Sequence, residues 1–124
     1  MLVAGRYRVA RQKDQAVKNG PQKSLAGKGS SLDIRMLAWD KGGIPLLLVS
    51  AGRKTGPAVA RNRFRRRVRM AFLAALRKRD WAIQPGPSFV LWVRPARWNP
   101  AGCRIEYQDI ENQIESSLGR MRLP

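Results

Sequence analysis

The sequence contains no histidine and only one cysteine, Cys103. Without histidine, no imidazole can act as a general acid or base or ligate a metal ion. A single cysteine excludes an internal disulfide and a thiolate zinc cluster, and a lone thiol in a basic domain is most often passive and reduced. The eight acidic residues are scattered at positions 14, 33, 40, 80, 106, 109, 111 and 115, with no obvious acid–base pair or metal cluster. We therefore expect neither a catalytic residue nor a metal ligand in the chain itself.

Long apolar runs are missing as well. The longest one, at residues 44–51, is far too short to span a bilayer. Near the start of the chain, Arg6 and Arg8 interrupt the apolar residues before the core of a secretory signal could develop. These absences, together with the reduced thiol, lead us to expect a soluble, cytoplasmic protein.

Positive charge is what the sequence has in excess. There are 25 Lys and Arg residues against 8 Asp and Glu residues, which gives a formal net charge of +17 over 124 residues. A compact domain with this charge repels itself, and the repulsion is tolerable when the working partner is a polyanion. Nucleic acid is the first candidate partner and an anionic membrane surface is the second.

The hydrophobic content of 44% is enough for one modest core, so we expect a single domain over residues 1–124. Its first part, residues 1–31, is basic and expected to be partly flexible. Gly20-Pro21 ends a short helix there, and residues 22–31 follow as a basic loop or a weak edge strand. The residues that hint at this helix are Val9, Ala10, Ala16 and Val17.

Three segments have the pattern of β-strands. Residues 32–39 alternate between two faces, with Leu32, Ile34, Met36 and Ala38 on one of them. The turn residues 40–43 predict a hairpin to a second strand at 45–51, with Leu47, Val49 and Ala51 on one face and Ser50 on the other. A third strand is expected at 89–94, before Pro95.

Two longer helices are expected. Gly56-Pro57 favours a helix start, and the helix then runs to about Arg79. A final amphipathic helix spans about 107–121. The order of elements indicates an α+β, two-layer sandwich, αβββαβα-like, with a small central β-sheet packed against helices. The expected apolar stripes are Phe64, Val68, Ala71, Phe72, Ala75 and Leu76 in the first of the two helices, and Ile110, Ile114, Leu118 and Met121 in the second.

The segment between Asp40 and Asp80 contains no acidic residue but twelve Lys and Arg residues. A solvated helix normally mixes both signs, because i,i+4 pairs offset the repulsion between like charges. A helix surface without acid makes physical sense if phosphates supply the counter-charge. Most of the cations are arginines, whose planar fork binds phosphate in a bidentate way and stacks on bases. These features favour RNA over DNA or an anionic lipid as the partner.

The stretch from Val49 to Arg69 resembles the bacterial ribonuclease P protein family, in which a strand ending in Ser and basic residues is followed by Gly-x-Ala-Val and a helix opening on Arg-Asn-Arg. The resemblance is weaker over 89–95, 11–17 and the final helix, and it extends over about 11–121 in all. The matching residues are Arg53, Lys54, Gly56, Ala58, Val59, Arg61, Asn62, Arg63, Arg65, Arg66 and Arg69.

The resemblance implies a fold like that of a ribosomal protein domain and a subunit that does not itself cleave. The catalytic RNA subunit would hold Mg²⁺ and hydrolyse precursor tRNA to release the 5′ leader, as an endoribonuclease. The protein would bind ribonuclease P RNA through Arg53, Lys54, Arg61, Asn62, Arg63, Arg65, Arg66 and Arg69. The candidate contacts to the leader, in a cleft between the sheet and the first helix, are Lys13, Gln15, Arg35 and Ser50.

The sequence departs from the family pattern at several positions. Gln15 stands where an aromatic of the leader cleft is usual, and Met70 where an acidic residue commonly follows the motif. Pro57 replaces a commonly polar residue, and Ala51-Gly52 takes the place of a more usual Val-Ser. These departures suggest a divergent member with the same function.

Other interpretations remain open. A ribosome-associated or other structural RNA-binding protein would share the charge and the fold, and a stand-alone nuclease would need the clustered carboxylates or histidine that are missing. Stacking on a single-stranded leader calls for aromatic side chains. Tyr7, Trp39 and Trp92 are available but are expected to be ordinary packing or surface residues, and Trp81 and Trp98 are expected to cap the sheet edge or the core.

Overall fold

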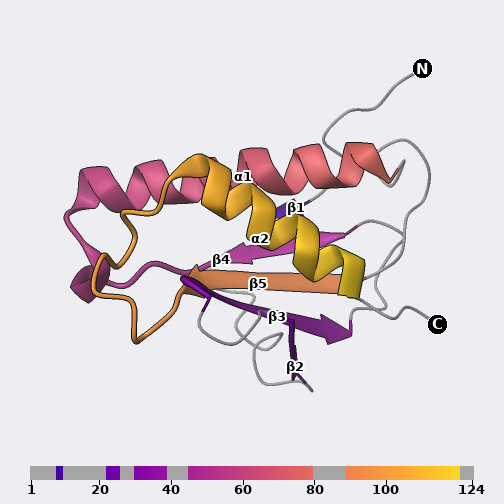
Figure 1. Ribbon diagram of the computed structural model, residues 1–124, viewed down its shortest axis with the longest axis horizontal. Helices are drawn as coiled ribbons and strands as arrows, with labels where there is room; N and C mark the ends of the chain where they lie inside the picture. Colours follow the sequence, from indigo (N-terminus) through magenta and orange to yellow (C-terminus); the bar gives the residue numbers. More distant parts are fainter. Residues whose placement is uncertain (1–7, 10–21, 26–29, 39–44, 80–88, 121–124) are drawn as a thin grey trace.

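A computed structural model describes residues 8–9, 22–25, 30–38, 45–79 and 89–120 of the chain. The elements form two layers, a five-stranded sheet and a pair of helices (Figure 1). In chain order they are β1 (Arg8–Val9), β2 (Gln22–Ser24), β3 (Leu32–Ala38), β4 (Leu46–Val49), the short 3-10 helix η2 (Arg53–Thr55), α1 (Ala58–Lys78), β5 (Phe89–Pro95) and α2 (Tyr107–Arg120). The α+β sandwich predicted from the sequence is confirmed.

The sheet has the strand order β1-β4-β5-β3-β2. β5 lies between β3 and β4, antiparallel to the first and parallel to the second. The predicted hairpin between residues 32–39 and 45–51 is therefore wrong, because these two strands are not neighbours. Alternation and turn residues predict the faces of a strand and a reversal of the chain, but they do not predict which strand pairs with which. A central strand has both faces covered by neighbouring residues, which fits the nearly continuous apolar run of β5.

Both helices lie on one face of the sheet (Figure 1). Pro57 is the N-cap of α1, which confirms the predicted helix start, and the six predicted stripe residues of α1 are all buried. Phe72 meets Phe89 of the sheet edge-to-face, with ring centroids 6.3 Å apart. In α2, the predicted residues Ile110, Ile114 and Leu118 are buried, whereas Met121 lies outside the described residues. The main core thus forms between the helices and one sheet face.

The sheet face opposite the helices is apolar at one end. Leu37, Leu46, Leu48 and Val90 form a second buried cluster, against which the half-buried ring of Trp92 packs. The position of Ser50 on this face, away from Leu47 and Ala51, agrees with the predicted alternation. Towards the other end, the same face carries polar side chains, which are described below.

Three predictions for the ends and loops have different outcomes. β2 pairs antiparallel with β3, which confirms the edge-strand alternative for part of residues 22–31. Val9 lies in β1 and not in a helix, and the remainder of that predicted helix lies outside the described residues. Trp98 is 59% exposed, so it does not cap the core, and Trp81 is outside the described residues. Among the elements described, no helix has the length and apolar character needed to cross a membrane.

Candidate nucleic-acid interface

The outer surface of α1 carries exposed arginines that have no partner among the described residues. Arg63, Arg66 and Arg69 are exposed, and none of them makes a hydrogen bond or an ion pair with any described residue. They point away from the sheet because the apolar stripe occupies the opposite side of the helix. Nothing on α1 offsets their charge, since the helix contains no acidic residue. Their guanidinium groups are therefore available to an external anion.

Arg61 and Arg65 lie where α1 meets the chain that follows β4. The Nε of Arg61 donates to the carbonyl of Gly56 at 3.1 Å, and a terminal nitrogen of Arg65 donates to the carbonyl of Ala51 at 3.3 Å. The Oδ1 of Asn62 accepts a further hydrogen bond from Arg65 at 3.2 Å. Both arginines are half-buried, so they support the local backbone while part of each fork remains accessible.

The predicted basic residues Arg53 and Lys54 are exposed on η2, directly before α1. This turn is held in place by two contacts of Thr55. Its hydroxyl donates to the carbonyl of Gly52 at 2.6 Å, and its carbonyl accepts a hydrogen bond of 3.0 Å from the backbone N–H of Cys103. The basic surface thus continues from α1 onto a turn with a fixed backbone.

One cation of this surface was missed in the sequence. Arg104 is exposed and lines a hollow together with Arg63 and Arg67, between the start of α1 and the chain before α2. Arg67 donates to the carbonyl of Ile105 at 2.9 Å, which joins these two segments. Arg104 is 35 positions beyond the Arg-rich motif, so only the tertiary structure brings it there.

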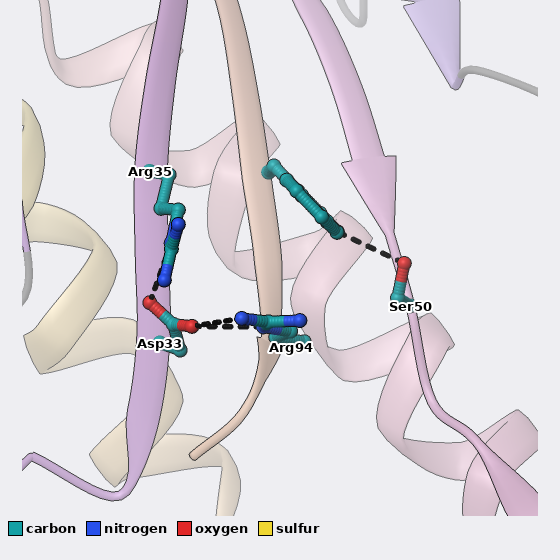
Figure 2. Close-up of polar contacts among 5 residues, drawn as sticks. Asp33, Arg35, Ser50 and Arg94 are labelled. Carbon is teal, nitrogen blue, oxygen red and sulfur yellow. Dashed lines mark hydrogen bonds and ion pairs between the residues drawn. The ribbon is translucent and has the colours of Figure 1, made fainter. Parts of the chain in front are cut away.

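On the sheet face opposite the helices, β3, β5 and the residue that follows β4 present a chain of polar contacts (Figure 2). Asp33 accepts hydrogen bonds from Arg94 at 2.8 Å and from Arg35 at 3.3 Å. The guanidinium carbon of Arg94 lies 4.9 Å from the centroid of the Trp92 ring, and the Nε1 of Trp92 donates to the hydroxyl of Ser50 at 2.9 Å. The contacts hold four hydrogen-bonding side chains and one aromatic ring in fixed positions.

The structure brings two of the four predicted leader contacts together. Arg35 and Ser50 flank the row of Trp92 and Arg94 on this face, whereas Lys13 and Gln15, like Tyr7 and Trp39, lie outside the described residues. Asp33 and Arg94 were not predicted as part of the site. The signal that pairs them is the antiparallel register of β3 and β5, in which Asp33 stands opposite Arg94 and Arg35 opposite Trp92.

Two pKa values are shifted, and both belong to α2 and not to either surface. The hydrogen bond from Arg79, at 2.8 Å, lowers the pKa of Glu115 below its ordinary value, although partial burial opposes the shift. Burial and a hydrogen bond to Glu111 raise the pKa of Tyr107. In the described part of the chain, no three Cys, Asp or Glu residues are grouped as metal ligands would be.

A family model of ribonuclease P matches residues 10–122. The chain belongs to the ribonuclease P protein family. It is thus the protein subunit of ribonuclease P, an endoribonuclease of tRNA processing, and its partner is the ribonuclease P RNA. Both the family and the function agree with the resemblance seen in the sequence.

Solved structures of ribonuclease P proteins have the same fold. The chain is similar to the protein from Thermotoga maritima, at 20% identity and a TM-score of 0.65, over 93% of this chain and 97% of that one. It is also similar to the protein from Staphylococcus aureus, at 20% identity and a TM-score of 0.58, over 91% and 93% of the two chains. A comparison with curated protein sequences gives no match.

Proposed function

We propose that the arginine surface of α1 binds the phosphates of ribonuclease P RNA. The observation that carries this proposal is the exposure of Arg63, Arg66 and Arg69 on a helix with no acidic residue, where none of the three has a partner in the described part of the chain. Phosphate contacts of this kind fix the register of a protein on RNA and contribute most of the affinity. The further members of this RNA-binding set are Arg53, Lys54, Arg61, Asn62 and Arg65.

The helix-free sheet face is proposed to bind the 5′ leader of precursor tRNA. Arg35 and Arg94 supply positive charge there, and Ser50 supplies a hydroxyl next to the ring of Trp92. Single-stranded RNA is bound in general by a basic surface with aromatic rings on which bases stack. Lys13 and Gln15 belong to the same proposal through the family resemblance.

The chemical step is assigned to the RNA subunit, which would hold the Mg²⁺ ions. When bound, such ions activate water and stabilise charge on the phosphate that is cleaved. The residues of this chain would bind and orient: the α1 surface positions the RNA, and the sheet face holds the leader beside it. No side chain of the chain is assigned a proton-transfer role.

Reconstitution tests the function directly. The purified full-length protein is added to a bacterial ribonuclease P RNA at low Mg²⁺, and cleavage of precursor tRNA is followed. We expect strong stimulation, a product with the mature 5′ end and no cleavage by the protein alone. Tight RNA binding without stimulation, with RNAs from several bacteria, would instead favour a ribosome-type RNA-binding protein, and cleavage by the protein alone would favour a nuclease.

A further inference from the structure

Trp98 is the largest exposed apolar side chain in the described part of the protein. It lies in the loop between β5 and α2, with 59% of its surface exposed, and its indole makes no hydrogen bond to a described residue. Trp92, by comparison, is half-buried and hydrogen-bonded. The apolar surface of an exposed Trp stays in contact with water unless a partner covers it, so the position of Trp98 calls for an explanation.

The loop that carries Trp98 has a fixed backbone. On one side, the carbonyl of Ser31 accepts hydrogen bonds from the backbone N–H of Ala96 at 2.9 Å and from the side chain of Asn99 at 3.4 Å. The Oδ1 of Asn99 also accepts a bond from the N–H of Ala101 at 3.1 Å. On the other side, the backbone N–H of Cys103 donates a hydrogen bond to the carbonyl of Thr55 in η2. The ring is therefore presented by an anchored loop, which lowers the entropy lost when it binds a partner.

The surroundings of Trp98 are positively charged. Arg97 is its neighbour in the chain and is exposed, and residues 96–105 contain no acidic residue. The backbone hydrogen bond between Cys103 and Thr55 places this loop against η2, where Arg53 and Lys54 are exposed. A protein or lipid partner would need an apolar surface around the ring, whereas the residues here match the alternation of bases and phosphates in a single strand.

We propose that Trp98 stacks on an unpaired RNA base and that Arg97 binds a phosphate next to that base. The inference deepens the proposed function, on which it rests, because it adds a base contact to surfaces that otherwise bind phosphates and the leader. Stacking is sequence-tolerant, since every base has a π-face. The base comes either from ribonuclease P RNA or from the leader of precursor tRNA, and the chemistry is the same in both.

The test compares Trp98→Ala, Trp98→Phe and Arg97→Ala in the full-length protein. For the RNA that supplies the base, Trp98→Ala lowers the affinity by at least about fivefold with an unchanged salt dependence, and Trp98→Phe restores most of it, because an aromatic ring is retained. Arg97→Ala lowers both the affinity and the salt slope, the latter by about one. Lys78→Ala, which removes one exposed charge from the far end of α1, is the matched control and leaves both unchanged.

Two binding assays identify the source of the base. If Trp98→Ala loses affinity for ribonuclease P RNA in the absence of precursor tRNA, the base belongs to ribonuclease P RNA. Loss that is seen only when the reconstituted holoenzyme binds precursor tRNA with a leader, and not tRNA without one, assigns it to the leader. If Trp98→Ala binds like the unmodified protein in both assays, the inference is wrong, while stimulation of cleavage by the unmodified protein leaves the proposed function intact.

A third assay does not depend on ribonuclease P. The unmodified protein should prefer a single-stranded RNA oligonucleotide to an abasic oligonucleotide of the same length, and Trp98→Ala should reduce this preference. If reconstitution fails, this preference still supports the stacking role of Trp98. An equal affinity of the unmodified protein for both oligonucleotides would overturn that role.

Discussion

The indole Nε1 of Trp92 on β5 donates a hydrogen bond of 2.9 Å to the hydroxyl of Ser50, one residue beyond β4. The backbone N–H of Ser50 also donates to the carbonyl of Val93 at 3.0 Å, so Ser50 is held next to β5 by two bonds. Through Trp92 the contact extends to Arg94, and from Arg94 to Asp33. One hydroxyl thus orients the ring on the face that we assign to the leader (Figure 2).

A double-mutant cycle on Trp92 and Ser50 measures this bond. Trp92→Phe and Ser50→Ala each remove one partner, and we expect a coupling free energy of about 1 kcal/mol in urea unfolding, because a part-buried neutral hydrogen bond has that value. A coupling near zero would contradict the bond. Ser50→Ala should also weaken the binding of precursor tRNA that has a leader, with no effect on ribonuclease P RNA.

Gly102 and Gly52 form a matched pair of glycines. Gly102 has a φ of 61°, and a Cβ there would overlap the backbone of Thr55, so Gly102→Ala should lower the free energy of unfolding by at least about 2 kcal/mol. At Gly52, φ is −71° and no described atom lies within 4 Å of an added Cβ. Gly52→Ala should therefore change the free energy of unfolding by less than about 1 kcal/mol. Similar losses in chemical denaturation for both variants would contradict this account.

The sequence predicts helices and faces well, because both follow from local periodicity. The six stripe residues of α1 and the alternation of Ser50 against Ala51 are where the pattern places them. The arginines of α1 that we propose to bind RNA are also exposed or half-exposed as expected, since the side of α1 away from the stripe must face outward.

The order of the strands and the pairing of distant residues could not be predicted. The insertion of β5 between β3 and β4 depends on contacts between segments far apart in the chain, which no local pattern records. Arg94 and Asp33 meet only in that register, 61 positions apart. The exposure of Trp98 was not predicted because tryptophan is buried in most proteins. Only the structure of the anchored loop shows that Trp98 is exposed.

The ion pair between Glu115 and Arg79 predicts a pH dependence of stability. Since the pair lowers the pKa of Glu115 in the folded protein, its contribution is complete above the ordinary value of 4.5 and is lost as the pH falls through the lower, folded value. Glu115→Gln should therefore lose less stability than the unmodified protein when the pH is lowered below about 4.5. The midpoint of thermal unfolding of both proteins, measured from neutral pH to below about 4.5, checks this prediction. Parallel curves of the midpoint against pH for the two proteins would contradict it.

Ser117 and Ser116 are neighbours on α2 with opposite environments. The hydroxyl of Ser117 is fully buried and has no hydrogen-bond partner among the residues that the structure describes, whereas Ser116 is exposed. Ser117→Ala should raise the free energy of unfolding by about 1 kcal/mol, because it removes an unpaired buried hydroxyl and favours the helix. Ser116→Ala gains only the helix propensity, about 0.5 kcal/mol. Urea unfolding separates the two, and a loss of stability in Ser117→Ala would show that its hydroxyl is satisfied.

The arginine surface of α1 predicts a change in salt dependence. Arg63 and Arg66 are exposed and have no described partner, so Arg63→Ala and Arg66→Ala should leave the free energy of unfolding within about 0.5 kcal/mol of its original value. Each should weaken binding to ribonuclease P RNA and reduce the slope of log affinity against log salt by about one, because one counterion fewer is released.

Arg67→Ala is the contrasting variant. Its guanidinium binds the carbonyl of Ile105, so its removal should lower the stability of the protein, in addition to any effect on RNA. Titration of labelled ribonuclease P RNA at several salt concentrations, with unfolding measured in parallel, separates the two kinds of arginine. Unchanged affinity and unchanged salt slope in both Arg63→Ala and Arg66→Ala would overturn the assignment of α1 as the RNA surface, since that assignment rests on these exposed guanidinium groups.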